Sequence, residues 1–501
     1  MGRCRNDLHP RRCRGHRMTR RLASLATIAA LLLAAALPPA PAQAQDGPLR
    51  IEITQGVQRP MPIALRFEAE AGAQDLRDQI TEVIAADLAM TGLFEIAQDG
   101  DTPETHFERS IDYIAWKATQ VEAVVTGRVV EAEGSVSVAF RLFDVFAGQP
   151  LGDGIQFDAP AEGWRRAAHK IADQIYARIT GESPYFDSRI AFVGESGPAT
   201  ERVTRIGVMD QDGAGVQWLT EPGELVLSPR FSPDGRTILY TDFATGTAQI
   251  MSLDLGRVDS MPLTRDPRAM SFAPRYSPDG KWIAFSRETA GNTDIWIMQV
   301  DNPSFAKPLT QGPSIDTAPS WSPDGQHLVF ESDRSGSSQL YVMRADGSNP
   351  TRISFGGEGA YGEPAWSPRG DRIAFTRQTG TGSIIGIMRP DGSDEQILSG
   401  PVAPGLQAPD PLSEALEEAT DLPPEAVQQE IPAPEDAAAE DTAWRDAGPS
   451  WSPNGRVLIF TRFTDGEDSG RLHSVDITGR NMRPVALNIA ASDPAWGPLL
   501  P

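Results

Sequence analysis

The stretch Pro229-Arg230-Phe231-Ser232-Pro233-Asp234-Gly235 decides the fold, because copies of it recur along the C-terminal two thirds of the chain. Each of the first five copies has a Pro, any residue, an aromatic residue, Ser and Pro, followed by a turn pair such as Asp-Gly, and the last copy has Gly497 in place of the Ser. The aromatic residues of the copies are Phe231, Tyr276, Trp321, Trp366, Trp451 and Trp496. They stand 45 residues apart, except for one step of 85. A period of about 45 residues is typical of the blades of a β-propeller.

Short apolar segments follow each copy in the same order. After the second copy, Ile283-Ala284-Phe285 comes first, then Ile295-Trp296-Ile297-Met298, and then a segment that ends in Leu309-Thr310. Together with the strand that carries the aromatic residue, they make four strands in each repeat. Proline fixes φ and Asp-Gly favours turns, so we expect Ser-Pro-Asp-Gly to close a hairpin between the first two strands.

The ends of the repeat region indicate how many blades there are. Ile190-Ala191-Phe192-Val193 matches the second strand of a repeat but has no marker before it. The last copy, Pro494 to Pro498, is incomplete, and it reads as a first strand that no second, third or fourth strand follows. The two fragments add up to one blade. We therefore predict that residues 186–501 form an all-β six-bladed β-propeller closed by the C-terminal strand.

The 85-residue step contains an insertion at about 400–441, rich in Pro, Ala and Glu. From Pro401 to Ala447 there are twelve acidic residues and one basic residue, Arg445. This composition predicts a disordered acidic loop on the fifth blade. A solvated spacer is the simpler interpretation, and a binding segment is the alternative.

The N-terminus has the pattern of a secretory signal peptide over residues 1–44. Arg20 and Arg21 precede an apolar run, and Ala42-Gln43-Ala44 offers small residues for cleavage between Ala44 and Gln45. The run is shorter than the roughly 20 residues that a membrane anchor needs. Met18 is a more natural start than Met1, because a complete basic segment follows it.

Cleavage would leave an acidic chain without cysteine. Cys4 and Cys13 both precede Met18, so we expect no disulfide and no thiol chemistry. Residues 1–44 carry eight Arg and one Asp, so their removal shifts the formal net charge from −23 to −30. Such a charge repels nucleic acid and anionic membrane surfaces. We expect an exported, monomeric protein of the periplasm of a Gram-negative bacterium, with no direct membrane insertion.

Residues 45–185 read as a small mixed α/β domain, which makes the whole chain α+β. Apolar residues from Leu76 to Leu88 recur at helical spacing before Gly92. Two strands joined at Glu133-Gly134 read as a hairpin. A second helix is predicted over Trp164 to Thr180, stopped by Gly181.

No motif for catalysis, metal binding or a cofactor stands out. Gly-x-Ser-x-Gly, a phosphate loop and a dinucleotide fingerprint are missing from the sequence. The histidines after the signal are scattered, so we expect no metal site, no cofactor and no enzyme activity. An acidic pair such as Asp242 and Asp254 keeps open the alternative of an exported propeller enzyme that acts on peptide or glycan.

A propeller of this kind would bind other proteins at the mouth of its channel. The segments before the markers should run from the outer strand of one blade to the inner strand of the next, and ring one mouth. The candidate partner-binding residues there are Met270, Ser271, Phe272, Ala273, Ser314, Asp316, Thr317, Tyr361 and Glu363. Exposed Met270, Phe272 and Tyr361 would suit a protein interface. The alternative is that these loops pack on themselves.

Three parts of the sequence resemble the TolB family of the Tol-Pal system. Leu49 to Val57 is similar to the mature N-terminus of that family, and Ile171 to Val193 is similar to its domain junction. The third part is the set of repeats. The domain order and the junction make the resemblance specific, because repeats alone are shared by many propellers.

The resemblance implies a non-enzymatic adaptor in the periplasm. Such an adaptor links Pal, a peptidoglycan-associated outer-membrane lipoprotein, to the inner-membrane TolA complex, and supports outer-membrane integrity and constriction at cell division. It implies that Pal docks around Ala273 and Thr317. It also implies that the N-terminal segment engages TolA, through Leu49, Arg50, Ile51, Glu52 and Ile53. The acidic insertion departs from the family pattern near blade five.

Overall fold

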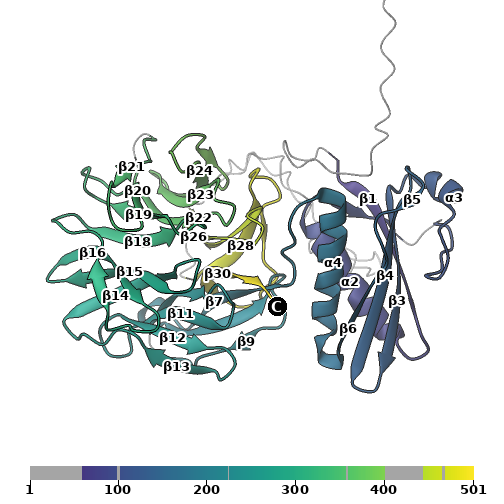
Figure 1. Ribbon diagram of the computed structural model, residues 1–501, viewed down its shortest axis with the longest axis horizontal. Coiled ribbons are helices and arrows are strands. Elements are labelled where there is room, and N and C mark those ends of the chain that lie inside the picture. The colour runs from purple at the N-terminus through teal and green to yellow at the C-terminus, as the bar shows by residue number, and fades with distance from the viewer. Residues whose placement is uncertain (1–58, 99–101, 224, 357–358, 401–443, 465–468) are drawn as a thin grey trace, which may run out of the picture. The chain divides into compact units, whose positions relative to one another are not determined.

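The computed structural model describes residues 59–98, 102–223, 225–356, 359–400, 444–464 and 469–501 (Figure 1). The chain divides into two units, and the larger one, residues 49–501, contains every described residue. The predicted signal peptide, the segment 49–53 and most of the acidic insertion lie outside the described residues, so they stay predictions. No helix of the described part is both long and apolar enough to cross a membrane.

The N-terminal part is a mixed sheet with two long helices. Its elements are β1 (Met61–Ala69), α2 (Gln74–Met90), β2 (Phe94–Ile96), α3 (Tyr113–Lys117), β3 (Ala123–Ala132), β4 (Ser135–Asp144), β5 (Gln149–Pro150), β6 (Ile155–Pro160), η1 (Ala161–Gly163) and α4 (Trp164–Thr180). The strand order is β2-β1-β3-β4-β5, and β6 also pairs with β4. Strand β1 runs parallel to β2 and β3, whereas β3 and β4 form the predicted antiparallel hairpin.

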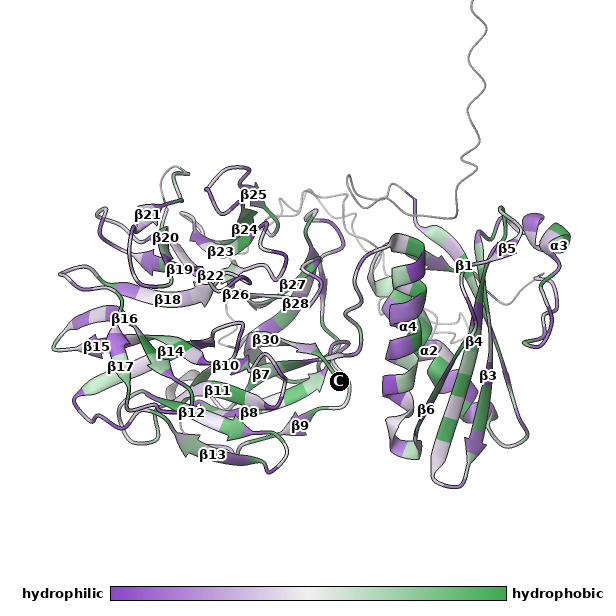
Figure 2. Ribbon diagram, in the orientation of Figure 1, coloured by the Kyte–Doolittle hydropathy of each residue, from purple (hydrophilic) through white to green (hydrophobic). Residues whose placement is uncertain are grey.

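Burial explains why these elements pack as they do. Buried and partly buried residues alternate over most of β4, as a strand with one face on a core requires. The ribbon of this strand carries both hydrophobic and hydrophilic residues (Figure 2). On α4, Ile171, Ile175 and Ile179 recur four residues apart and are fully buried in the same core. Gly181 ends α4 with φ of +74°, a left-handed cap that glycine adopts without strain.

The C-terminal part consists of repeated antiparallel sheets. Four of them have four strands each, in the orders β10-β11-β12-β13, β14-β15-β16-β17, β18-β19-β20-β21 and β30-β7-β8-β9. A further sheet has eight strands, β22 to β29, but its two halves are joined through a single parallel pairing of Ser383 with Arg445. In the sheet β30-β7-β8-β9, the last strand β30 pairs with β7, which is the first strand after the α/β part.

The strand bounds follow the sequence period. One sheet comprises β7 (Ser188–Ser196), β8 (Val203–Asp210), β9 (Gln217–Trp218) and β30 (Ala491–Leu499), with a short helix η2 (Ala199–Glu201) between β7 and β8. The sheet that follows it comprises β10 (Val226–Phe231), β11 (Thr237–Asp242), β12 (Gln249–Asp254) and β13 (Asp259–Pro262). The next two comprise β14 (Ala269–Tyr276), β15 (Trp282–Thr289), β16 (Asn292–Gln299), β17 (Ala306–Pro308), β18 (Asp316–Trp321), β19 (His327–Ser332), β20 (Gln339–Arg344) and β21 (Thr351–Arg352). The eight-stranded sheet comprises β22 (Tyr361–Trp366), β23 (Ile373–Gln378), β24 (Ser383–Met388), β25 (Gln396–Ile397), β26 (Trp444–Trp451), β27 (Val457–Thr464), β28 (Arg471–Asp476) and β29 (Arg483–Pro484).

The Ser-Pro-Asp-Gly marker closes the hairpin between the first two strands, as predicted. In the second copy, the Ser277 hydroxyl donates to Asp279 over 2.6 Å and accepts from the backbone N–H of Trp282 over 3.0 Å. Gly280 is left-handed, with φ of +69°. The hydrogen bond from Ser277 lowers the pKa of Asp279. Asp279 therefore stabilises the turn that joins β14 and β15.

Replacing Ser277 with Ala should lower the free energy of unfolding by about 1–2 kcal/mol, because a buried hydroxyl that bridges two strands is lost. Urea denaturation of the full chain measures this change. Ser304→Ala, in an exposed loop of the same sheet, is the control and should leave stability unchanged. Equal effects of the two substitutions would contradict the role of the marker serine.

Candidate partner-binding site

The first strands of the repeat sheets lie next to one another. Strand β10 contacts β14, β14 contacts β18, β18 contacts β22, β22 contacts β26, β26 contacts β30, and β30 contacts β10. The predicted partner-binding residues fall on three of these strands or just before them. The geometry of the first strands therefore decides what this surface presents.

Every first strand carries a β-bulge at the same place. In β14, the pairing with β15 slips by one residue between Phe272 and Arg275. The extra residue, Ala273, has a left-handed φ of +51° and precedes Pro274. The left-handed residues of the six strands are Ser228, Ala273, Ala318, Glu363, Gly448 and Asp493. A proline has no N–H for the sheet ladder, and a bulge is where a sheet tolerates one.

Side chains of neighbouring strands accept hydrogen bonds from the N–H groups of three of these bulges. Glu363 of β22 accepts from the N–H of Gly448 on β26 over 2.8 Å. Asp493 of β30 accepts from the N–H of Ser228 on β10 over 3.0 Å. The Ser286 hydroxyl accepts from the N–H of Ala318 on β18 over 3.0 Å. The bulges are thus hydrogen-bonded from one sheet to the next. Sequence reasoning missed them, although a small or polar residue directly before each marker proline was their signal.

The predicted mouth residues lie mostly in strands, not in loops. Residues Met270 to Ala273 belong to β14, and Thr317 belongs to β18, whereas Ser314 lies just before that strand. Met270 keeps 38% of its surface exposed, and Phe272 and Thr317 are half-buried. Each first strand begins several residues before its marker proline and already pairs there with the second strand of its sheet. The loops between sheets are therefore shorter than the sequence predicted.

Three of the predicted residues are buried and serve the fold. Tyr361 is 1% exposed, so its predicted exposure is wrong; it packs against Phe375, and its hydroxyl is hydrogen-bonded to Glu395. Burial and the charge of Glu395 raise the pKa of Tyr361 to about 12. Ser271 is also buried. The carboxylate of Asp316, 2% exposed, accepts two hydrogen bonds from Arg334, at 2.8 and 2.9 Å.

Asp316→Asn should therefore destabilise the chain by about 2 kcal/mol, because Arg334 loses the carboxylate that it pairs with. Thermal unfolding should occur at a lower temperature for this variant. Ser314→Ala, two residues away and half-buried, is the matched control and should unfold like the wild type. An unchanged unfolding temperature for Asp316→Asn would show that the ion pair does not hold β18.

Asp242 and Asp254, the acidic pair that suggested an enzyme acting on glycan, lie too far apart for glycosidase chemistry. In the β11–β12 hairpin, Asp242 pairs with Gln249, whereas Asp254 pairs with Thr237. Five residues of strand separate the two positions, which is about 17 Å. Glycosidase carboxylates stand about 5 to 9.5 Å apart. Both aspartates instead accept hydrogen bonds from backbone N–H groups of the turns that follow them.

A cluster of polar residues, separate from the first strands, joins α2 and α4 to the turn after β8. The Nδ1 atom of His169 lies 2.7 Å from Asp87, and Gln211 donates to the other oxygen of Asp87 over 2.7 Å. Arg165 donates to Asp210 and Asp212. Burial alone would lower the pKa of His169, but the charge of Asp87 and the carboxylate of Asp210, 3.9 Å from Nε2, raise it to about 10.

His169, Asp210 and Asp212 bring ligand atoms to within 4.8 Å of one another, so they are the described residues that could hold a metal ion. However, Arg165 already pairs with both carboxylates, and the raised pKa keeps His169 protonated at neutral pH. The arrangement therefore fits an internal ionic cluster better than a metal site. The sequence could not show it, because its members come from positions far apart.

The cluster predicts a stability that falls at alkaline pH. The folded chain holds the proton of His169 more tightly than the unfolded chain, whose pKa is near 6.5. The stabilisation is therefore complete below about pH 6.5 and is lost as pH rises through about 10. Urea denaturation at pH 6.5 and 9.5 should show this loss in the wild type. His169→Gln should flatten the dependence, whereas His106→Gln, at an exposed histidine, should not.

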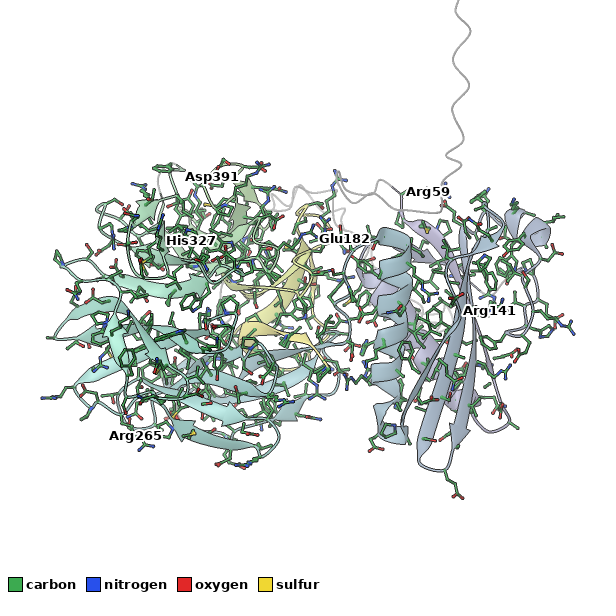
Figure 3. The ribbon with its side chains drawn as sticks, in the orientation of Figure 1. Arg59, Arg141, Glu182, Arg265, His327 and Asp391 are labelled. Carbon is green, nitrogen blue, oxygen red and sulfur yellow. The ribbon has the colours of Figure 1, made fainter. Side chains whose placement is uncertain are left out.

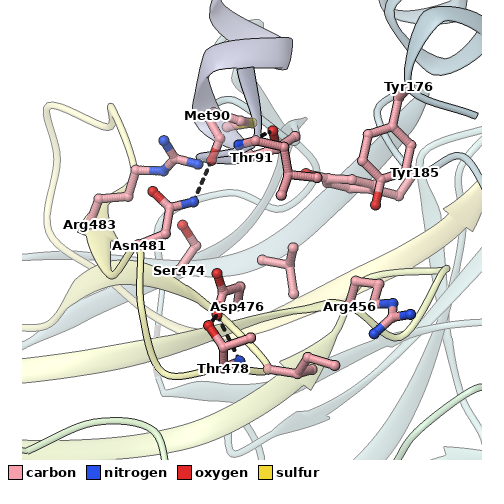
Figure 4. A pocket seen from close by; sticks show the side chains of 13 residues that line it. Met90, Thr91, Tyr176, Tyr185, Arg456, Ser474, Asp476, Thr478, Asn481 and Arg483 are labelled. Carbon is pink, nitrogen blue, oxygen red and sulfur yellow. Dashed lines mark hydrogen bonds between the residues drawn. The ribbon is translucent and has the colours of Figure 1, made fainter. Parts of the chain in front are cut away.

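Further contacts connect α2 and α4 with the repeat sheets. Glu182, just after α4, is labelled in Figure 3. It accepts a hydrogen bond from Arg369 over 2.8 Å and another from Arg456. Asn481 donates to the carbonyl of Met90, at the end of α2, over 2.8 Å (Figure 4). The cavity beside this bond measures about 40 Å³. Its size suits a few water molecules and not an organic ligand.

Two family models match this chain. The TolB amino-terminal domain matches residues 49–151, and the TolB beta propeller domain matches residues 176–406. The chain belongs to the TolB family. The TolB family models thus cover parts of both the α/β region and the repeat sheets, in the order that the sequence predicted.

Curated relatives and a solved structure agree with this assignment. The Tol-Pal system protein TolB of Cereibacter sphaeroides is 50% identical over 256 residues, which are 50% of this chain and 57% of the relative. That of Jannaschia sp. is 48% identical over 245 residues, 48% of this chain and 55% of the relative. The matched part thus spans little more than half the length of these TolB relatives. The crystal structure of TolB from Acinetobacter baumannii shares the fold, with a TM-score of 0.69 and 24% identity over 90% of this chain and 100% of that one.

Proposed function

We propose that this chain is a non-enzymatic adaptor of a Tol-Pal system in the periplasm. It binds a Pal-like outer-membrane lipoprotein and a TolA-like inner-membrane protein, and so maintains outer-membrane integrity and supports envelope constriction during cell division. The observation that carries the proposal is the identity of about half of the matched residues with Tol-Pal system proteins TolB. The wide separation of Asp242 and Asp254 supports binding over glycan cleavage.

The proposed binding body is a six-bladed propeller over residues 186–501, preceded by the α/β domain over 45–185. The cycle of contacts among β10, β14, β18, β22, β26 and β30 supports six blades, if the eight-stranded sheet counts as two. The pairing of β30 with β7 supports closure by the C-terminal strand. The signal peptide before Gln45 and a TolA-binding segment at 49–53 complete the proposal.

The proposed Pal surface keeps those predicted residues that solvent reaches. They are Met270, Phe272, Ala273, Ser314, Thr317 and Glu363. Met270 and Phe272 supply apolar area, and Thr317 and Glu363 supply polar groups at the edge. The buried Ser271, Asp316 and Tyr361 support the strands beneath this surface.

Thr317→Arg should weaken binding of the soluble domain of the Pal-like lipoprotein from the same genome by at least tenfold, because a long charged side chain enters the interface. Isothermal titration calorimetry with the mature protein measures the affinity. The unfolding temperature should stay nearly unchanged, since Thr317 is half-buried and its hydroxyl pairs only with that of Ser286 among the described residues. Thr351→Arg, at an exposed site of β21, is the control.

Two outcomes would contradict the proposal. If the wild-type mature protein does not bind the Pal-like domain at low salt, the adaptor role fails. If Thr317→Arg lowers the unfolding temperature as strongly as Asp316→Asn, the residue supports the fold and is misplaced in the interface.

A further inference from the structure

Two arginines occupy the same place on adjacent first strands. Arg230 on β10 and Arg275 on β14 each follow the marker proline directly. The equivalent residues of the other four first strands are small: Ser320, Ala365, Ser450 and Ala495. At this position, two neighbouring first strands therefore carry long cations and the other four carry short side chains.

Neither arginine has a carboxylate partner within the described part of the chain. Arg230 donates to the carbonyl of Pro229 over 2.6 Å, and Arg275 donates to that of Pro274 over 3.0 Å. Both are half-buried. Elsewhere in the repeat sheets, Arg287 and Arg334 pair with aspartates at 2.8 Å. Among the described residues, these two cations thus lack a carboxylate partner although the whole chain has a formal net charge of −23.

The two arginines lie on neighbouring strands, since β10 contacts β14, and each feels the charges around it. Burial lowers the pKa of both, and the positive charge of Arg230 lowers that of Arg275 further. Asp493 of β30 and Glu363 of β22 oppose this shift for both arginines. Asp493 lies near Arg230, because it accepts a hydrogen bond from the N–H of Ser228, two residues before Arg230 on β10. Both carboxylates also accept hydrogen bonds from bulge N–H groups.

We infer that Arg230 and Arg275 form a binding site for one carboxylate. This carboxylate belongs to a loop of the protein that docks at the first strands of the repeat sheets. Two guanidinium groups offer the forked donors that carboxylates bind best. Arg275 lies two residues beyond Ala273 along β14, about 7 Å from the proposed Pal surface. A loop of a docked partner can span that distance. Since the occupant comes from the docked protein, this role rests on the proposed function.

The test compares matched charge removals in the mature protein. Arg230→Gln with Arg275→Gln removes this binding site. Arg257→Gln with Arg344→Gln removes two exposed arginines elsewhere in the repeat sheets, at the turn after β12 and at the end of β20. Calorimetric titration with the soluble Pal-like domain should show at least a tenfold loss of affinity for the first double variant, with a weaker dependence on salt. The second double variant should bind as the wild type does. The unfolding temperature of the first variant should not fall, because unpaired half-buried charges are removed.

Several outcomes would overturn this binding site while leaving the adaptor role intact. One is equal affinity of the wild type and the Arg230→Gln, Arg275→Gln variant for the Pal-like domain. Another is that inorganic phosphate raises the unfolding temperature only when both arginines are present, while binding of the Pal-like domain does not depend on them. The site would then bind a free anion. Failure of the wild type to bind the Pal-like domain would instead remove the adaptor role itself.

Discussion

Proline cannot donate a backbone hydrogen bond, and the first strand of every repeat sheet carries one at the same place. The sheet accommodates it with a β-bulge, and the residue before it takes a left-handed conformation. That conformation costs about 1–2 kcal/mol for a residue with a side chain. The surrounding structure offsets the cost through hydrogen bonds between neighbouring sheets, such as those of Glu363 and Asp493. The inner surface thus depends on a constraint that one residue type imposes.

Much of the architecture is readable from the sequence because it repeats. The marker spacing predicted the sheets, and the Ser-Pro-Asp-Gly turn closes its hairpin as expected. The helix predicted over Trp164 to Thr180 has those bounds in the structure. Local rules suffice for these features, since turns, caps and periodic burial involve residues close in sequence.

The site was less readable, because it depends on contacts between distant residues. Tyr361 looked like an exposed loop residue, but the strand starts earlier than the marker suggests and carries it into the core. Asp242 and Asp254 looked like a pair until the hairpin register separated them. His169 looked isolated, and tertiary packing surrounds it with carboxylates. No local pattern encodes such neighbours.

The pairing of β30 with β7 has a consequence for how the molecule is made. Leu499 pairs with Ser188, more than 300 residues earlier in the chain. Such non-local pairing slows folding, because the entropy of closing the loop is lost before the contacts form. During synthesis, β7 emerges long before its partner and presents an unpaired strand edge until the last residues follow. That edge is a template for pairing with other chains. Keeping the unfinished chain apart from its own copies is therefore a requirement of biogenesis as much as of stability.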